Sequence, residues 1–392
     1  MSKIRILYVY HVSQIGGGSY TLLNIIKELD KTKYEPIVLL RNQGPLVAEL
    51  ENAAARVLFL KDIRAIPYNK DLFQVSSIKA YLKIIQSLFR YHRIVRMVKP
   101  DIIHINSMML YPYLFHFKRD NIKRIVHIRE NWPKEEHVYQ RAIAQKVIQT
   151  FSQHIFAINK HSAQLLKLQE SKVTIVYDWI NMKNRFAEMN FSDLIHEDCE
   201  GKKVYLFTGG FQSIKGIQQV VEAFSTIVKD KMSLLLILGD DKNELSNNKS
   251  LVKTASLIKG DHRIKIISAT YNITHLLQQS YCVLSYFVIP HANLALPESI
   301  ICQTPVIAAK TPESMEYSVN GEYAKLFKMN NYNEFCYIIE HIDGWHESLK
   351  NSLSKGARIV EKMFDTNDNS AKIEQIYEQL YKNKKEKNSG NC

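Results

Sequence analysis

Two glycine-rich turns each follow an apolar run and precede a helical pattern. Gly16-Gly17-Gly18 comes after the run Ile4–Tyr10, and Gly209-Gly210 comes after Val204–Thr208. Glycine lets backbone approach a ligand closely, and the free N–H groups of a helix start attract an anion. Lys215, just before the second helix, adds a charge suited to a diphosphate. A plain tight turn is the alternative for Gly17 and Gly18, and a solvated surface lysine is the alternative for Lys215.

A third segment, residues 290–308, reads as a loop, a short helix and a strand. Asn293 and Leu294 lie in the loop, and Pro297 suits the first helical turn. Glu298 falls in the same turn, where a carboxylate is favoured. It can act only as a partner of the helix dipole, or it can accept hydrogen bonds from the two hydroxyls of a ribose.

Polar residues also follow two other apolar runs. His104 and Ser107 accompany the run Asp101–Ile105 and are candidates for lining an acceptor site. His127 lies near the end of the run Arg124–Ile128, and Arg129 follows that run. His127 can instead be a buried histidine with a carbonyl partner, and Arg129 can form an ion pair with its neighbour Glu130 rather than contact a phosphate.

The elements that position these residues alternate between strand and helix, which predicts an α/β fold with parallel sheets. The pattern restarts after residue 200, so we expect two Rossmann-like domains facing across a cleft. The expected boundaries are 1–185 for an acceptor-side domain and 186–365 for a nucleotide-sugar-binding domain. A helix at 366–381 should pack back on the first domain, and residues 382–392 should form a disordered tail.

Charge and cysteine content narrow the class of protein. The 392 residues carry a net charge of +13, and residues 1–190 hold 29 Lys/Arg against 15 Asp/Glu. Such a basic half suits an acidic substrate, an anionic membrane surface or nucleic acid. No nucleic-acid-binding module is recognisable, so nucleic acid is not expected. The five cysteines are widely spaced and form neither a disulfide framework nor a metal site, which favours a reducing cytoplasm.

The helix expected at Ser76–Met97 is basic and amphipathic. We expect its apolar face to be formed by four residues, Ile78, Leu82, Ile85 and Leu88. It either packs on the core with a solvated basic side, or it docks on anionic lipid as a peripheral membrane helix.

Taken in order, these motifs resemble the retaining glycosyltransferase family 4, which has the GT-B fold. Glu298 and the strand Pro305–Ala308 resemble its donor-site signature, and Thr208–Gly216 resembles its phosphate loop with Lys215 on the lysine. Gly17 and Gly18 fall on its donor-phosphate glycines, and His127 falls on its active-site histidine.

The resemblance implies transfer of a sugar from a nucleotide-sugar donor to a glycan or lipid-linked acceptor, with retention at the anomeric carbon. His127 and Glu298 would then be catalytic, and Gly210, Lys215, Asn293 and Leu294 would bind the donor. Arg129, His104 and Ser107 would contact phosphate or acceptor. Neither a metal nor another cofactor is expected. The setting would be cell-surface polysaccharide synthesis, in the cytoplasm or at the inner face of the membrane.

Two departures from the family pattern keep alternatives open. Pro290 replaces the first glutamate of the family's pair, and Gly210 replaces the arginine of the phosphate loop. A divergent subfamily with another donor sugar is one explanation. A catalytically silent GT-B partner subunit is another, and a nucleotide-sugar epimerase is a third.

Overall fold

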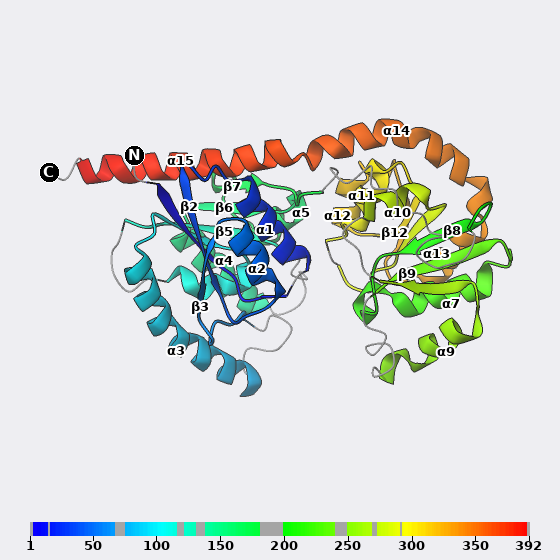
Figure 1. Cartoon of the computed structure of the whole chain (residues 1–392), viewed down its shortest axis with the longest axis horizontal. Coiled ribbons are helices and arrows are strands. Elements are labelled where there is room, and N and C mark those ends of the chain that lie inside the picture. Colours follow the sequence, from blue (N-terminus) through cyan, green and yellow to red (C-terminus); the bar gives the residue numbers. More distant parts are fainter. Residues whose placement is uncertain are drawn as a thin grey trace. The chain divides into compact units, whose positions relative to one another are not determined.

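The chain divides into two compact units in a computed structural model (Figure 1). Unit 1 joins Met1–Trp179 to Thr366–Cys392, and unit 2 is Ile180–Asp365. The structure describes residues 3–14, 16–66, 75–115, 121–130, 138–180, 199–239, 249–268, 273–290 and 292–389. Among the helices so described, none is both long and apolar enough to cross a bilayer.

Unit 1 is built on a seven-stranded parallel sheet in the order β3-β2-β1-β4-β5-β6-β7. The strands are β1 (Ile4–Val9), β2 (Tyr34–Leu40), β3 (Arg56–Phe59), β4 (Ile102–Ile105), β5 (Lys123–Ile128), β6 (His154–Ala157) and β7 (Val173–Ile175). The strand order reverses between β1 and β4, the point at which open parallel sheets bind ligands. The predicted apolar runs Ile4–Tyr10 and Asp101–Ile105 coincide with β1 and β4, and the run that begins at Arg124 falls in β5, whereas β7 has only three half-buried residues.

Helices cover both faces of this sheet, because side chains alternate along each strand. They are α1 (Gly17–Glu28), α2 (Pro45–Asn52), α3 (Val75–Val98), η1 (Met108–Leu114), α4 (Val138–Phe151), α5 (Lys160–Leu165), η2 (Glu170–Lys172) and α15 (Thr366–Ser389). Leu7 and Val9 of β1 join the core beneath α3 and α4. Ile6 and Tyr8 join the core beneath α1, α2 and α15, on the other face (Figure 1).

The C-terminal helix α15 is held to unit 1 by buried polar contacts as well as apolar packing. Tyr377 shares a 3.1 Å hydrogen bond with the Tyr8 hydroxyl and a 2.6 Å bond with His104 Nδ1. Farther along, Lys384 pairs with Asp101 at 2.6 Å. The helix continues to Ser389, so the expectation of a disordered tail is wrong for residues 382–389. Lys384 has an anionic partner on the sheet, which a reading of composition alone could not supply.

Helix α3 packs on the core with a different face from the one predicted. Of the four residues expected in its apolar face, only Leu88 is buried, and Ile78, Leu82 and Ile85 are exposed. The buried face is instead made by Ser77, Ile84, Leu88, Tyr91, Val95 and Val98. The prediction failed because this helix carries apolar residues on two of its sides.

Unit 2 contains a six-stranded parallel sheet in the order β10-β9-β8-β11-β12-β13. The strands are β8 (Lys203–Phe207), β9 (Ser233–Leu238), β10 (Ile264–Ile267), β11 (Cys282–Ser285), β12 (Val306–Lys310) and β13 (Lys325–Lys328). The helices are η3 (Ser213–Lys215), α7 (Ile217–Ile227), η4 (Lys249–Leu251), α9 (Val252–Gly260), α10 (Ile273–Gln279), α11 (Ala295–Ile301), α12 (Pro312–Tyr317), α13 (Tyr332–Glu340), η5 (Ile342–Gly344) and α14 (His346–Met363). The order reverses between β8 and β11, which places the ligand-binding point after those two strands.

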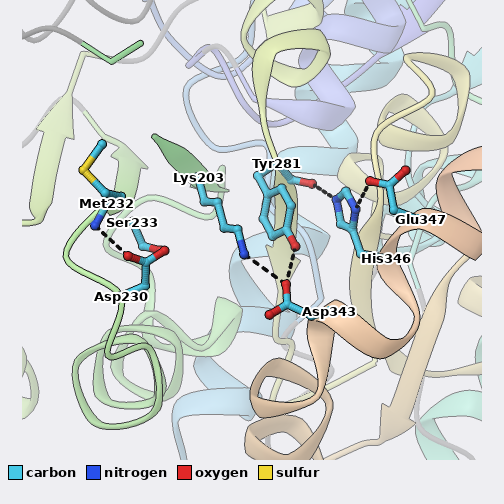
Figure 2. A network of polar contacts seen from close by, with 8 residues as sticks. All are labelled: Lys203, Asp230, Met232, Ser233, Tyr281, Asp343, His346 and Glu347. Atoms are coloured by element: carbon cyan, nitrogen blue, oxygen red, sulfur yellow. Dashed lines mark hydrogen bonds and ion pairs between the residues drawn. The ribbon is translucent and has the colours of Figure 1, made fainter. Parts of the chain in front are cut away.

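A polar network at the opposite edge of the same sheet fastens the start of α14 (Figure 2). Asp343 accepts from Lys203 Nζ at 3.0 Å and from the Tyr281 hydroxyl at 3.2 Å. The His346 ring stacks on Tyr281 at 3.9 Å, and its Nε2 bonds to the Tyr281 carbonyl at 2.8 Å. Lys203 begins β8 and Tyr281 precedes β11, so this network lies at the amino ends of the strands, away from the ligand-binding edge.

Gly216 is required by both its backbone conformation and its surroundings, so we predict that Gly216→Ala is strongly destabilising. Its φ is +79°, and a Cβ would lie 2.1 Å from the Tyr286 carbonyl oxygen. We expect a loss of about 2 kcal/mol or more in unfolding free energy, measured by urea denaturation. Gly260→Ala is the control, since nothing lies within 4 Å of its Cβ position. Equal effects of the two substitutions would contradict the packing argument.

Candidate functional site

In unit 2, the turn after β8 is built so that Lys215 sits at the switch point of the sheet. Gly209 packs against the Phe207 ring, where a Cβ would come within 2.3 Å, and Gly210 has a φ of +62°. The turn η3 is tied to the segment after β11, because Val288 N donates to the Ile214 carbonyl at 3.1 Å. This hydrogen bond joins the two loops that flank the switch point, and Lys215 directly follows the bonded residue Ile214.

Burial desolvates both Lys215 and Glu298, and it shifts their pKa values in opposite directions. Burial lowers the pKa of Lys215 below its usual 10.5. Glu298 keeps part of its surface exposed, yet burial of its carboxyl raises its pKa to about 8. Within the described residues, neither side chain has a hydrogen-bond or ion-pair partner. Ionisable groups held out of water without a partner are typical of binding sites, where the ligand supplies the missing contacts.

The loop before α11 adds one more unsatisfied polar group. Asn293 is only 5% exposed, and its Oδ1 is buried without a hydrogen-bond partner. Leu294 precedes the first turn of α11, where its carbonyl accepts from Glu298 N at 3.0 Å. Pro290 is partly exposed in the same loop. Asn293, Leu294 and Glu298 therefore share one short stretch, as the sequence predicted.

In unit 1, the glycine turn after β1 packs against an arginine. Helix α1 begins at Gly17, and a Cβ on Gly18 would lie 2.6 Å from the Tyr10 hydroxyl and 3.4 Å from Arg129 Nε. Only glycine fits at residue 18 without a shift of Tyr10 or Arg129. The structure thus brings together Gly17, Gly18 and Arg129, which the sequence had placed in separate loops.

Arg129 forms an ion pair, but its partner is Asp178 and not Glu130. The Arg129 Nη2 lies 2.8 Å from Asp178 Oδ1, and each side chain is 7% exposed. The remaining Arg129 donors, Nε and Nη1, are buried without a hydrogen-bond partner. Glu130 accepts from the Ser107 hydroxyl and, at 3.0 Å, from Met108 N. Arg129 therefore combines both interpretations, being paired on one side and unsatisfied on the other.

Three of the predicted residues lie inside the core of unit 1. His127 and His104 have no exposed surface, and Ser107 is 1% exposed. His104 bonds to Tyr377, whereas both ring nitrogens of His127 lack a hydrogen-bond partner. Burial lowers the pKa of His104 to about 3 and that of His127 well below 6.5, with Arg129 adding to both effects. Both rings are therefore neutral, and neither reaches a surface at which a substrate could bind without rearrangement of its neighbours.

Two residues of this region escaped the sequence reasoning. Tyr10 shapes the glycine turn, and Asp178 anchors Arg129. Asp178 follows β7, so recognition of that short strand would have flagged it as a residue beyond a strand end. In the described part of the chain, no three His, Cys, Asp or Glu residues are grouped as a metal site.

Two doubly wound parallel sheets in one chain, each with a glycine turn at its switch point, define the GT-B class of fold. The sequence model of the family described as "Glycosyl transferases group 1" matches residues 193–355. The model of "Glycosyltransferase Family 4" matches residues 15–184. Between them the two models match most of the chain, which therefore belongs to the glycosyltransferases that they describe, as the motifs had indicated.

Individual relatives are distant. The chain is 24% identical over 193 residues to the N-acetyl-alpha-D-glucosaminyl L-malate synthase of Bacillus anthracis, a match covering 48% of this chain and 49% of that protein. The match thus spans about half the length of this relative. HepE of Anabaena, solved with UDP and glucose, superposes with a TM-score of 0.73 at 16% identity over 95% of this chain and 99% of its own. Sucrose-phosphate synthase of Thermosynechococcus elongatus superposes with a TM-score of 0.74 at 14% identity, over 97% of this chain and 99% of its own. These structures share the fold.

The buried ion pair yields a prediction about stability. Asp178→Ala should reduce the unfolding free energy by about 3–5 kcal/mol, because it leaves the Arg129 charge buried without its partner. The double variant Arg129→Met with Asp178→Leu should lose much less unfolding free energy, because it leaves no buried charge without a partner. The control is Glu222→Ala, since its pair with Lys253 is exposed and contributes under about 1 kcal/mol. Urea denaturation measures all of them, and a mild effect of Asp178→Ala would show that Arg129 has other compensation.

The raised pKa of Glu298 predicts a pH-dependent stability. Between pH 4.5 and 8 the folded protein keeps a proton on this carboxyl that the unfolded chain releases, so stability falls as the pH rises. Glu298→Gln removes this loss. The variant should gain roughly 2 kcal/mol over wild type at pH 8, after allowance for partial exposure, and almost nothing at pH 4.5. Denaturation curves at both pH values test this, and a constant difference would contradict the assigned pKa.

Proposed function

We propose that the chain transfers a sugar from a nucleotide-sugar donor to a glycan or lipid-linked acceptor, with retention, in the synthesis of a cell-surface polysaccharide at the cytoplasmic side. The observation that carries this proposal is the presence of two desolvated ionisable groups without partners among the described residues, Lys215 and Glu298, at the switch point of unit 2. A nucleoside diphosphate supplies what each one lacks: anionic oxygens for the ammonium and a vicinal diol for the carboxylate.

The contacts of the donor follow from the chemistry of these groups. The diphosphate binds the Lys215 ammonium and the backbone N–H groups at the start of α7, whose N-cap Gly216 provides no side-chain hydrogen bond. The ribose hydroxyls donate to Glu298, and this favours the ionised carboxylate, so binding lowers the pKa that burial had raised. Asn293 Oδ1, buried and unsatisfied, can accept from the same ligand.

Unit 1 carries a buried cation of its own, Arg129. Gly210 stands where the family has an arginine, which leaves Lys215 as the side-chain cation of its loop. Arg129 has two unsatisfied donors, of which Nε lies beside Gly18, and Asp178 fixes its orientation. It is suited to a phosphate or to the acceptor. The sugar contact that the resemblance implies for His127 remains a prediction, and the complete burial of its ring means that such contact requires a rearrangement.

The transfer step needs no protein nucleophile. The bond from the anomeric carbon to the donor phosphate breaks, a bond to the acceptor oxygen forms on the same face, and the acceptor proton passes to the leaving phosphate. The protein acts by positioning the reactants and by stabilising the developing charge on the diphosphate, a role for Lys215. We expect this step to proceed without a metal.

A silent GT-B partner subunit is the second candidate, and one observation favours it. The family's first donor-site glutamate is replaced by Pro290, whose ring cannot hydrogen bond to a sugar hydroxyl. The two candidates differ in turnover. With a panel of nucleotide sugars and an acceptor extract, the enzyme releases nucleotide and gives a product whose anomeric configuration, read by NMR, matches the donor. A silent subunit binds nucleotide at most.

Donor binding is tested by thermal stability with UDP, GDP, ADP and CMP, each alone and as sugar conjugates. A nucleotide at 100 times its Kd should add about 2.7 kcal/mol to the wild type. Lys215→Ala and Glu298→Gln should abolish most of that shift, whereas the control Lys350→Ala, on an exposed face of α14, should keep it. If no nucleotide stabilises the wild type, the donor site does not exist in this form.

A further inference from the structure

Helix α3 is apolar on two faces, and only one of them packs on unit 1. Its core face is complete, with Ile84, Leu88, Tyr91 and Val95 buried beneath the helix. On another side lies an exposed stripe, which we call the α3 stripe: Val75 at 68% exposure, Ile78 at 47%, Leu82 at 56%, Ile85 at 52% and Phe89 at 61%. A solvated helix needs one apolar face, so the second calls for another contact.

The spacing of the α3 stripe is regular. Its residues are separated by three or four positions, and at about 100° per residue they fall within an arc of roughly 80°. That arc is centred about 140° around the helix from the core face. From Val75 to Phe89 the stripe runs about 21 Å along the helix. A continuous band of this length is a surface, and differs from the single exposed apolar residues that any protein has.

Positive charge borders the stripe. Residues 75–98 contain no aspartate or glutamate, and the basic residues of the helix are all exposed: Lys79, Lys83, Arg90, Arg93 and Arg96. The first three lie about 40–80° from Val75 on the outward side, and Arg93 and Arg96 continue the line of the stripe past Phe89. An apolar band edged by lysine and arginine is the pattern of a helix that lies in the interface of an anionic bilayer.

The neighbouring helix α4 also begins with exposed apolar side chains. Val138 is 51% exposed and Tyr139 is 80% exposed at the start of α4. Gln140, the next residue, lies close enough to Tyr81 of α3 to lower the pKa of its hydroxyl against the effect of burial. The apolar start of α4 is therefore adjacent to the amino-terminal half of α3. An exposed tyrosine beside an apolar stripe suits the headgroup region of a membrane.

Charge decides among the possible occupants. A second copy docked on the stripe would bring two all-cationic helices together, and like charges at an interface disfavour that contact. Nucleic acid would use the cations but would leave the apolar band in water. An anionic bilayer satisfies both parts at once, because acyl chains take the apolar side chains and headgroups take the charges.

We propose that the α3 stripe and its basic border dock unit 1 on an anionic lipid bilayer, with α3 lying in the plane of the interface. The docking is a property of α3 and is independent of the donor site in unit 2, so either proposal can fail while the other stands.

The test is co-sedimentation of the full chain with phosphatidylcholine vesicles, with and without 30% phosphatidylglycerol, at low and high salt. The stripe variant is Leu82→Ser with Phe89→Ser, and the basic variant is Lys79→Gln, Lys83→Gln and Arg93→Gln. Matched controls in unit 2 are Met232→Ser with Val252→Ser, at 49% and 57% exposure, and the exposed α14 set Lys350→Gln, Lys355→Gln and Arg358→Gln. All changes are at exposed positions, and a thermal melt checks that each variant folds.

Wild type should bind the anionic vesicles and largely release them at high salt. The basic variant should bind on the order of a hundredfold more weakly at low salt, from about fivefold per charge. The stripe variant should lose at least about tenfold at either salt concentration. The controls should match wild type. Failure of wild type to bind anionic vesicles overturns the proposal, as does an equal loss in stripe and control variants. A dimer in sedimentation equilibrium that the stripe variant abolishes, without vesicle binding by wild type, would show that the occupant is a second copy.

Discussion

The organisation of each unit follows from one constraint, which is that a parallel sheet covered by helices is buried on both faces. Polar side chains cannot be tolerated in the middle of such a sheet without partners, so the groups that meet solvent gather where the strands end. In unit 2 the turn after β8 and the loop after β11 diverge at the switch point, and Lys215 and Glu298 lie there. In unit 1 the turn after β1 meets Arg129 from the end of β5.

Two ionisable groups of unit 2, Lys215 and Glu298, show how the carboxyl edge of such a sheet can bind a ligand. Burial removes water from both side chains, and neither group shifts the pKa of the other. A structural ion pair would have stabilised both charged forms and offset the cost of their desolvation. Keeping Lys215 and Glu298 separate leaves each available to a different part of one ligand. Arg129 is a contrasting case, since Asp178 satisfies one of its nitrogens and so fixes the direction of the other two.

Much of the fold was predictable, because apolar runs separated by helices specify a parallel sheet. The short β7 and the lysine-flanked β13 were missed, since neither has enough apolar residues to stand out. At the candidate site, the glycine turns and Glu298 were named because they follow strands in sequence. What a sequence does not contain is which side chain at a strand end turns outward. The sequence therefore could not show that the His127 ring is fully buried, and its catalytic role stays a prediction. For α3, the sequence likewise could not show which of its two apolar sides packs on the core.

The core that encloses His127 also explains the connectivity of the chain. Tyr377 of α15 closes a buried polar group with Tyr8 and His104, and apolar residues of the same helix complete that face of the sheet. Exposed to water, these hydroxyls and imidazoles would be hydrated, and within the core they need partners that only α15 brings. Unit 1 is thus made of two segments separated by all of unit 2. One face of its sheet is covered only when α15 is in place, so the stability of unit 1 depends on that helix.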